Sequence, residues 1–508
     1  MQKRSLLYGA TVLTGSAIAT QLLGFAYRVQ LTRMMGAEAM GVYHLVMSVY
    51  SVVISLCLSG LSTASARLSA QYKATLRQDL TALLIKRLFC IFAVLALICG
   101  ALLLLGDRFI ARNILAESRA EMGITLLVPV ILLTGVENIL KNHFIGVGKV
   151  LPEAVCETVE MVLRAASAVV LLIIVNPASA ESAVACVICA MAVSEVFSSC
   201  AMAVLYKKGA VKGRGAASAP IGRAIASVAV PAALTSFAAN LLGSANNVMI
   251  PARLMAGGMD KSAAMSAIGE FFGMTVPMVA LPAIMIDGLL GVLMPSLSDH
   301  MARGEIIAVR RKASKAFPAV IFYIVLALTI MIPLFPVFAK GLYANFDEYK
   351  NVFLLCVWMA ISCIRSVSSV VMTGIGKQGA GALTFIAGSV LQLGFTWYLT
   401  PLHGLGMRAV ALGMIAAALL TLVLNLGFIR KYVGIKIRFV TWFVCPVVSA
   451  LGAYCLSFAL VKPIEGAAGA MFVRAVLTAA VYLLLMRAMG IRLRELFVIR
   501  RKNREVVR

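Results

Sequence analysis

The chain has 508 residues, of which 61% are hydrophobic and only 13% are charged, and its mean hydropathy is +0.97. Charged residues normally make up about a quarter of a soluble chain, so this composition excludes a water-soluble globular protein and indicates a polytopic membrane protein. The net charge of +25 does not indicate nucleic-acid binding, because the basic residues fall in short clusters between long apolar runs rather than along a solvated face.

The first apolar run follows a basic start, MQKRSLLYGATVLTG, that resembles the beginning of a signal peptide. No small-residue cleavage site precedes Arg28, so we expect a retained first membrane span. Counting about 20 residues per crossing, the sequence predicts an all-α protein with about fourteen transmembrane helices. Their approximate limits are 6–27, 40–63, 84–105, 122–140, 153–175, 182–205, 224–249, 268–295, 316–338, 351–373, 380–400, 405–429, 439–461 and 467–487.

The basic residues alternate between the two sides of the membrane in this scheme. Of the 46 lysines and arginines, 32 fall in ends and loops on one side and 11 on the other, and the remaining three, Arg164, Arg365 and Arg474, lie within spans. Cytoplasmic loops carry an excess of basic residues. The distribution therefore predicts that both termini are cytoplasmic, and the basic clusters are expected to attract anionic membrane lipids.

An internal repeat predicts the architecture. Short segments match in the same order and at similar offsets, namely LLGFAYRV (22–29) with LLGSANNV (241–248), SGLSTAS (59–65) with LGVLMPS (290–296), and GVGK (146–149) with GIGK (374–377). Duplication of a six-span unit gives two parallel repeats, which commonly enclose a cavity opened to each side in turn. The predicted parts are a lobe at 1–215, a lobe at 216–434, two extra transmembrane helices at 435–490 and a basic cytoplasmic tail at 491–508.

Polar residues inside the spans are the candidate site. A charged side chain in a span usually faces the bundle interior or a water-filled cavity and marks a pathway. The candidates for contact with a substrate in the cavity are Gln21, Arg28, Arg164, Asn246, Asn247, Arg253 and Arg365. The candidates for charge tuning or ion coupling are Glu137, Glu160 and Asp287.

Each candidate also has a structural interpretation. Glu160 and Arg164 lie one helical turn apart, so an ion pair that only joins helices is equally compatible with the sequence. Asn246 and Asn247 are also typical of hydrogen bonds between neighbouring spans. Arg28 and Arg253 also fit interfacial anchors whose charges reach the membrane surface.

Metal, cofactor and nucleotide sites are not expected. The pair Cys186 and Cys189 lies in an apolar run without a second pair or a histidine nearby, so it lacks the ligands of a zinc site. GVGK and GIGK lack the spacing of a phosphate-binding loop, GxxxxGK followed by Ser or Thr. These segments are expected to end helices instead, and no ATP-driven engine is predicted.

Several longer stretches resemble one family. These are QLLGFAYRVQLTRMMGAEAMGVYHLV, GLSTASARLSAQY, KNHFIGVGKVLPEAVCETVEMVLRA and NNVMIPARL. They are similar to the multidrug/oligosaccharidyl-lipid/polysaccharide flippase superfamily, in its branch of stage V sporulation protein B-like and lipid II flippase-like proteins. The chain differs from that branch at Gln21, where related proteins often carry arginine, and at Asn246, where many carry aspartate. These differences argue against lipid II itself as substrate and against ion coupling through the seventh span.

The resemblance implies a transporter without covalent chemistry in a bacterial plasma membrane. Its substrate would be an undecaprenyl-diphosphate-linked oligosaccharide or peptidoglycan precursor for capsule, cell wall or spore, moved with the help of H⁺, Na⁺ or the membrane potential. Arginine forks match phosphate oxygens, which suits the predicted cationic cavity. Two alternatives are a drug/cation antiporter of the same superfamily and, with less support, a glycosyltransferase using polyprenyl phosphosugars, for which the short outer loops offer no paired carboxylates.

Overall fold

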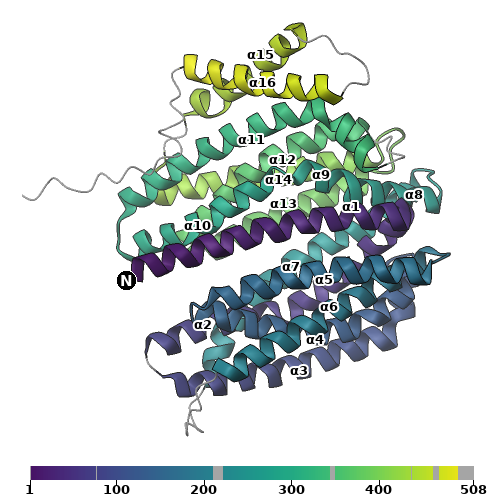
Figure 1. Cartoon of the computed structure of the whole chain (residues 1–508), viewed down its shortest axis with the longest axis vertical. Helices are drawn as coiled ribbons and strands as arrows, with labels where there is room; N and C mark the ends of the chain where they lie inside the picture. Colours follow the sequence, from purple (N-terminus) through teal and green to yellow (C-terminus); the bar gives the residue numbers. More distant parts are fainter. Residues whose placement is uncertain are drawn as a thin grey trace, which may run out of the picture. The chain divides into compact units, whose positions relative to one another are not determined.

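The computed structural model describes residues 2–75, 77–209, 221–343, 349–435, 438–460 and 468–489, and all regular structure in these residues is helical (Figure 1). Twelve of the described helices are long and apolar enough to cross a membrane. The predicted all-α polytopic membrane class is therefore confirmed. About fourteen crossings were expected, and the first two predicted spans fall largely on the two arms of α1 (Gln2–Cys57), which Gly36 separates. The predicted tail at 491–508 lies outside the described residues.

The first helix changes direction once. α1 (Gln2–Cys57) contains Gly36 at φ 82° and ψ 169°, a backbone conformation that is essentially restricted to glycine. This residue divides α1 into a first arm, 2–35, and a second arm, 37–57. We call the side of the molecule where this break lies the Gly36 end. α2 (Ser59–Ala74) follows the second arm almost directly.

The remaining helices follow in chain order with short connections. They are α3 (Gln78–Phe109), η1 (Ile110–Ile114), η2 (Ser118–Ala120), α4 (Glu121–Gly146), α5 (Val150–Val175), α6 (Ala180–Gly209), α7 (Ile221–Ala256), α8 (Lys261–Ile268), η3 (Gly269–Thr275), α9 (Val276–Ala280), α10 (Ala283–Ala302), α11 (Ile306–Leu342), α12 (Tyr349–Gly374), α13 (Gln378–Leu399), α14 (Met407–Val433), η4 (Val440–Val444), α15 (Cys445–Leu460) and α16 (Ala468–Ala488).

Helix bounds repeat with the offset that GVGK and GIGK predict. Both ends of α12 lie 228 residues after those of α4, and the starts of α11 and α13 follow those of α3 and α5 by the same 228 residues. Left-handed turn residues recur with this shift too: Gly148 at φ 75° corresponds to Gly376 at 77°, and Asn176 at 42° to Gly404 at 81°. The helices and their turns therefore agree with a duplicated unit, whereas the proposed lobe boundaries stay a prediction.

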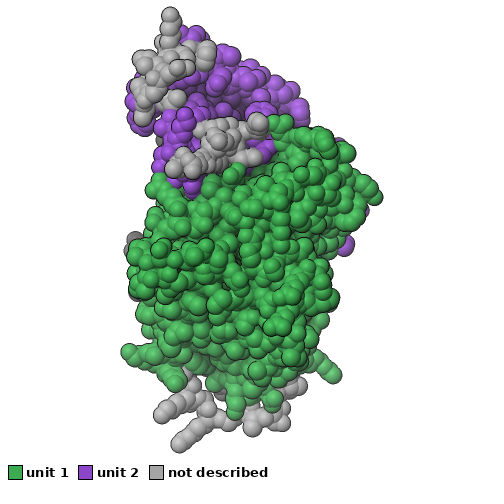
Figure 2. Space-filling model, turned by 90° about the vertical axis from the view of Figure 1, so that its right-hand side faces the viewer, with its two compact units in different colours: residues 1–278, 385–417 green, residues 279–384, 418–508 purple. Residues whose placement is uncertain are grey.

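The chain forms two compact units, each described here by itself (Figure 2). Unit 1 comprises residues 1–278 and 385–417, and unit 2 comprises residues 279–384 and 418–508. In unit 1 one apolar cluster joins α2, α3 and α4 through buried residues such as Leu84 and Ile139. In unit 2 Tyr482 of α16 is fully buried against α11, and its hydroxyl donates to the backbone oxygen of Phe322 at 3.3 Å.

Two short glycine-containing motifs cross in unit 1. The second arm of α1 begins with Ala37 and Gly41, four residues apart, and η3 contains Gly269 and Gly273 at the same spacing. A Cβ on Gly269 would lie 1.8 Å from the backbone oxygen of Ala37, and one on Gly41 would lie 2.2 Å from that of Met265. Such small-residue spacing lets helix backbones approach closely in membranes. We call this contact the glycine crossing.

Hydrogen bonds join α2 to α4 at regular intervals. Ser65 donates to the backbone oxygen of Ile139 at 2.7 Å, and one turn later the Ser69 hydroxyl lies 2.9 Å from Nδ1 of His143. After another turn, Lys73 donates to the backbone oxygen of Val147. In the second repeat, Leu297 and Val371 occupy the places of Ser69 and His143 and are fully buried. The same helix pair is therefore held by polar contacts in one repeat and by apolar packing in the other.

An ion-pair network joins three connections at the Gly36 end of unit 1. Arg119 of η2 donates to Glu38 of α1 at 2.7 Å and to Glu117 at 2.8 Å, while Lys261 of α8 lies 3.6 Å from Glu117. The Glu117 side chain is fully buried. Burial alone would raise the pKa of Glu117, but the hydrogen bonds from Arg119 outweigh burial and hold that pKa below its ordinary value.

Candidate functional site

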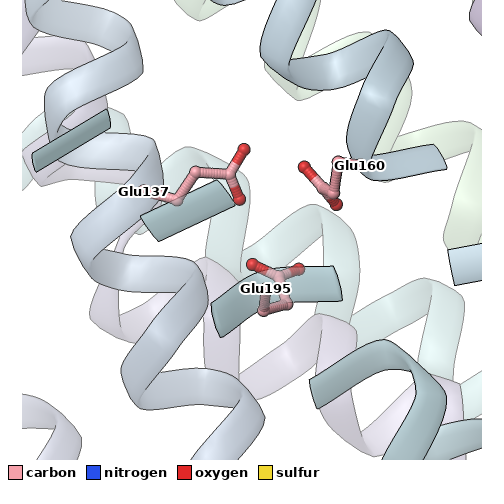
Figure 3. A group of neighbouring side chains, drawn as sticks. All are labelled: Glu137, Glu160 and Glu195. Atoms are coloured by element: carbon pink, nitrogen blue, oxygen red, sulfur yellow. The ribbon is translucent and has the colours of Figure 1, made fainter. Parts of the chain in front are cut away.

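Three carboxylates from three helices converge inside unit 1 (Figure 3). Glu137 of α4, Glu160 of α5 and Glu195 of α6 each present an oxygen, and these oxygens lie within 4.8 Å of one another. All three residues are buried, with 2%, 8% and 2% of their surface exposed. Each carboxylate lies within a predicted membrane span, and Glu137 lies three residues before the end of the span 122–140. The group is therefore expected inside the hydrocarbon layer but not at its centre. We call Glu137, Glu160 and Glu195 the carboxylate triad.

Two basic residues neutralise part of this charge. Helical spacing places Arg164 one turn after Glu160 and Lys141 one turn after Glu137. The Arg164 guanidinium donates to Glu160, to Glu195 at 3.0 Å and to the Ser194 hydroxyl at 3.1 Å. Lys141 Nζ lies 3.2 Å from Glu137 Oε1. Three carboxylates therefore face two cations, and one negative charge remains when all five groups are ionised.

The triad holds oxygen atoms that the described residues leave unpaired. Oε2 of Glu195 is buried without a hydrogen-bond partner, and Oε1 of Glu137 has the Lys141 ion pair but no hydrogen bond. Two carboxylates that face each other in a buried site cannot both stay ionised without a proton or cation between them. A single proton on one carboxylate would balance the remaining negative charge of the triad and its two cations. A divalent metal ion suits the triad less well, because beside Arg164 and Lys141 it would leave the group with a net positive charge.

Arg164 also faces the first helix. Its side chain is 21% exposed, and Tyr27 and Tyr43 of α1 lie within its electrostatic reach. The Tyr27 residue is 7% exposed, and its hydroxyl finds no hydrogen-bond partner in the described structure. The guanidinium thus contacts two carboxylates, and the buried, unpaired phenol of Tyr27 belongs to a neighbouring cluster that includes Ala165 of α5.

The asparagines of α7 form contacts between helices. Asn246 is buried and accepts a hydrogen bond from Thr396 of α13 at 2.7 Å. Asn247 donates to the hydroxyl of Ser48 in the second arm of α1 at 3.1 Å. These bonds match the helix-joining interpretation that the sequence left open. Their role in substrate contact stays a prediction.

The other candidates do not join the triad. Arg253 donates to the backbone oxygen of Trp397 at 3.0 Å, and its guanidinium lies 4.3 Å from the centre of that ring. Gln21 and Arg28 are exposed on the first arm of α1. Unit 2 contains exposed Asp287 and half-buried Arg365. In the described parts of the chain, Arg28 and Arg365 form no ion pair with an acidic side chain.

The second repeat replaces the three carboxylates at the equivalent positions with Arg365, Gly388 and Val423. Arg365 lies 228 residues after Glu137, but the three-helix contact beside it is built around fully buried Asn425 of α14. Asn425 accepts from Thr384 of α13 at 2.7 Å and donates to Ser368 of α12 at 3.0 Å. Ser369, which lies 3.4 Å from the same amide, occupies the place of Lys141. The second repeat therefore closes this junction without a carboxylate cluster, with half-buried Arg365 as the charged residue at the place of Glu137.

Comparison with known proteins then identifies the family. The family model described as polysaccharide biosynthesis protein matches residues 6–301, more than half of the chain. The chain belongs to the polysaccharide biosynthesis protein family. This family member is 22% identical over 468 residues to stage V sporulation protein B of Bacillus subtilis (strain 168), a match that covers 91% of this chain and 88% of the relative.

The fold of this polysaccharide biosynthesis family member is shared with solved transporters. One is a multidrug resistance MATE family transporter of the MOP superfamily in an inward-facing conformation, with a TM-score of 0.66, 16% identity and coverage of 82% of this chain and 94% of that chain. Another is a MOP superfamily transporter from Pyrococcus furiosus Vc1, with a TM-score of 0.62, 15% identity and coverage of 84% and 95%. The resemblance to the MOP superfamily expected from the sequence is thereby confirmed.

Sequence reasoning missed two features of this family member. Glu195 is a single carboxylate in the apolar run of α6, which is the same signal that identified Asp287 in the eighth predicted span. The spacing of Gly269 and Gly273 is the GxxxG signal of close helix approach. Both signals were available in the sequence, but only the structure shows which groups they meet.

Proposed function

We propose that this protein is an alternating-access flippase that translocates an undecaprenyl-diphosphate-linked oligosaccharide or peptidoglycan precursor across a bacterial plasma membrane for cell-surface polysaccharide synthesis. The family, the sporulation relative and the transporter fold support this proposal. It is a transporter rather than an enzyme. Both termini face the cytoplasm in this proposal, and membrane lipids surround the described spans.

The buried charge in the first repeat is the observation that carries the proposal. Charged side chains within spans are costly and usually mark transport pathways. The second repeat closes the equivalent helix junction with a hydrogen-bond network around Asn425 and without a carboxylate cluster, so helix packing alone does not require the triad. We infer that Glu137, Glu160 and Glu195 serve transport by binding a coupling ion.

The arginines are assigned to the substrate diphosphate. Arg28 and Arg365 form no ion pair among the described residues, so their guanidinium groups are available to phosphate oxygens, which arginine matches in geometry and charge. Arg164 contacts the substrate as well, through the exposed part of its side chain. Gln21, Asn246, Asn247 and Arg253 line the same path in this proposal, and Asp287 is a second candidate for ion coupling.

Depletion of the protein tests the substrate class. Cells that lack it should accumulate a polyprenyl-diphosphate-linked glycan on the cytoplasmic side, detected by mass spectrometry of extracted lipids. Re-expression of the wild type should clear the intermediate, and Arg365→Ala should not. Arg430→Ala is the matched control, because Arg430 is exposed in the last turn of α14. Depleted cells with an unchanged set of polyprenyl-linked lipids would contradict the proposal.

A drug/cation antiporter is the second candidate function. The carboxylate triad favours it, because an embedded acidic group can exchange protons or sodium for a cationic drug, and a MATE transporter shares the fold. The arginines within the spans disfavour a cationic substrate. A strain lacking the gene should become sensitive to cationic drugs if the antiporter hypothesis is right, and its drug sensitivity should be unchanged if the flippase proposal is right.

A further inference from the structure

We propose that Arg164 is a switch that exchanges a carboxylate partner for Tyr27 and the substrate diphosphate when the triad takes up one proton. This inference rests on the proposed flippase function and extends it by naming the coupling ion and the group that responds to it. The proton comes from water and adds to the unpaired Oε2 of Glu195. Nothing is oxidised and no covalent bond to substrate forms.

The first observation is that Arg164 is held by two carboxylates at once. It donates to both Glu160 and Glu195. Because each bond from an ionised donor to an ionised acceptor is about twice as strong as a neutral one, the guanidinium is firmly retained while both acids are charged. A proton on Glu195 removes one of these two charges. The phosphate of a substrate then competes with Glu160 alone.

The second observation is that a buried hydroxyl without a partner lies near Arg164. Tyr27 packs in one cluster with Met161 and Ala165 of α5, and Ala165 directly follows Arg164 in the sequence. The Tyr27 hydroxyl is buried, lacks a hydrogen-bond partner in the described structure and lies within electrostatic reach of Arg164. An unsatisfied buried hydroxyl is costly. Its oxygen can accept a hydrogen bond from a guanidinium that turns away from Glu195. The first arm of α1 would thereby respond to the state of the triad.

The charged and titratable groups around the carboxylate triad and its two cations come from four helices. They are Tyr27, Arg28, Tyr43 and Tyr50 of α1, Glu137 and Lys141 of α4, Glu153, Glu157 and Glu160 of α5, and Glu195 of α6. Lys141 remains paired with Glu137 in either state. A single proton therefore makes the triad and its two cations neutral, and no second cation is required.

The second repeat cannot perform this exchange. The positions 228 residues after Glu160 and Arg164 hold Gly388 and Gln392, which carry no charge. Coupling through an arginine is therefore a property of the first repeat. Because binding linkage is reciprocal, a substrate phosphate that engages Arg164 must also strengthen proton uptake by the triad.

Binding of undecaprenyl diphosphate to the purified full-length protein tests the switch. We expect the Kd of the wild type to fall at least about fivefold from pH 8 to pH 6, in the range typical of coupled sites. The double variant that combines Glu160→Gln with Glu195→Gln should bind undecaprenyl diphosphate tightly at both pH values, because neither side chain then holds Arg164 by charge. Glu181→Gln, a change in the first turn of α6 outside the triad, should behave as the wild type. A double variant that keeps the pH dependence of the wild type would overturn the switch.

A substrate-free measurement separates this inference from the proposed function. At a fixed pH of 8, phenylglyoxal should modify Arg164 faster in the double variant than in the wild type, as followed by mass spectrometry, whereas Arg28 should react equally in both. Tyr27→Phe should slow the release of Arg164 and reduce the difference in its phenylglyoxal modification between the double variant and the wild type. Equal modification of Arg164 in all variants refutes the switch even if undecaprenyl diphosphate binds. Failure of the lipid to bind at any pH contradicts the flippase proposal, even if Arg164 responds as expected.

Discussion

The glycine crossing gives the sharpest stability prediction. Replacing Gly269 by alanine places a Cβ 1.8 Å from the backbone oxygen of Ala37, whereas real contacts of this kind are essentially never shorter than 3.0 Å. The obstacle is backbone, so no side-chain rotation relieves it. The second arm of α1 and η3 must separate by more than 1 Å to accept the methyl group.

The expected cost follows from two opposing effects. Overpacking costs about 1–3 kcal/mol, and a rigid obstacle favours the upper end of that range. Alanine regains about 1 kcal/mol of helix propensity relative to glycine. The net loss in free energy of unfolding for Gly269→Ala is therefore about 2 kcal/mol, which corresponds to an about thirtyfold change in the folding equilibrium.

A graded series checks this reasoning. Purified full-length variants are titrated from mild detergent into SDS micelles, and unfolding is followed by tryptophan fluorescence. Gly273→Ala meets the side chain of Met40, whose flexible end is nearest at 3.2 Å, so it should lose much less stability. Gly243→Ala, with nothing within 4 Å, should match or exceed the wild type. Gly269→Ala and Gly243→Ala of equal stability would show that the two backbones are not in contact.

Three further predictions concern the hydrogen-bonded and charged contacts. Ser69→Ala leaves His143 without its buried partner and should lower the free energy of unfolding by about 1–3 kcal/mol, measured in the same SDS titration. Glu117→Gln should destabilise by about 1.5–3 kcal/mol. Because the pKa of Glu117 is lowered, its contribution is present above the ordinary pKa of glutamate and lost only as pH falls through the depressed value. The loss caused by Glu117→Gln should therefore be equal at about pH 8 and about pH 6, and a loss that shrinks at pH 6 would contradict the ion pair. Arg365→Ala should abolish flipping of a polyprenyl-diphosphate glycan in proteoliposomes while leaving membrane insertion intact, and wild-type flipping would remove this residue from the site.

The helices were predictable because hydrocarbon depth sets the length of an apolar run. The predicted span 153–175 ends where α5 ends, and its start differs from Val150 by three residues. The helices often continue beyond the apolar run, as α4 does to Gly146 from a predicted end at 140, because backbone hydrogen bonds also persist in polar segments. The repeat offset was predictable from the GVGK and GIGK turns, since glycine is the residue that readily adopts the left-handed conformation found at Gly148 and Gly376.

The candidate site was predictable only within single helices. Glu160 with Arg164 follows from one helical turn, and the structure forms that pair. The contact of Arg164 with Glu195 joins residues on two helices, and one sequence does not reveal which faces of these helices meet. For the same reason, the sequence identified Asn246 as polar but could not identify Thr396 as its partner.

The break in α1 has a mechanical consequence. Gly36 alone links the two arms, so the first arm is one residue away from the glycine crossing, which begins at Ala37. A rotation of the first arm, for instance one caused by Arg164 at Tyr27, would be transmitted to the second arm, because no flexible loop lies between them. Lengthening this linker by a few glycines should uncouple the arms while preserving both helices.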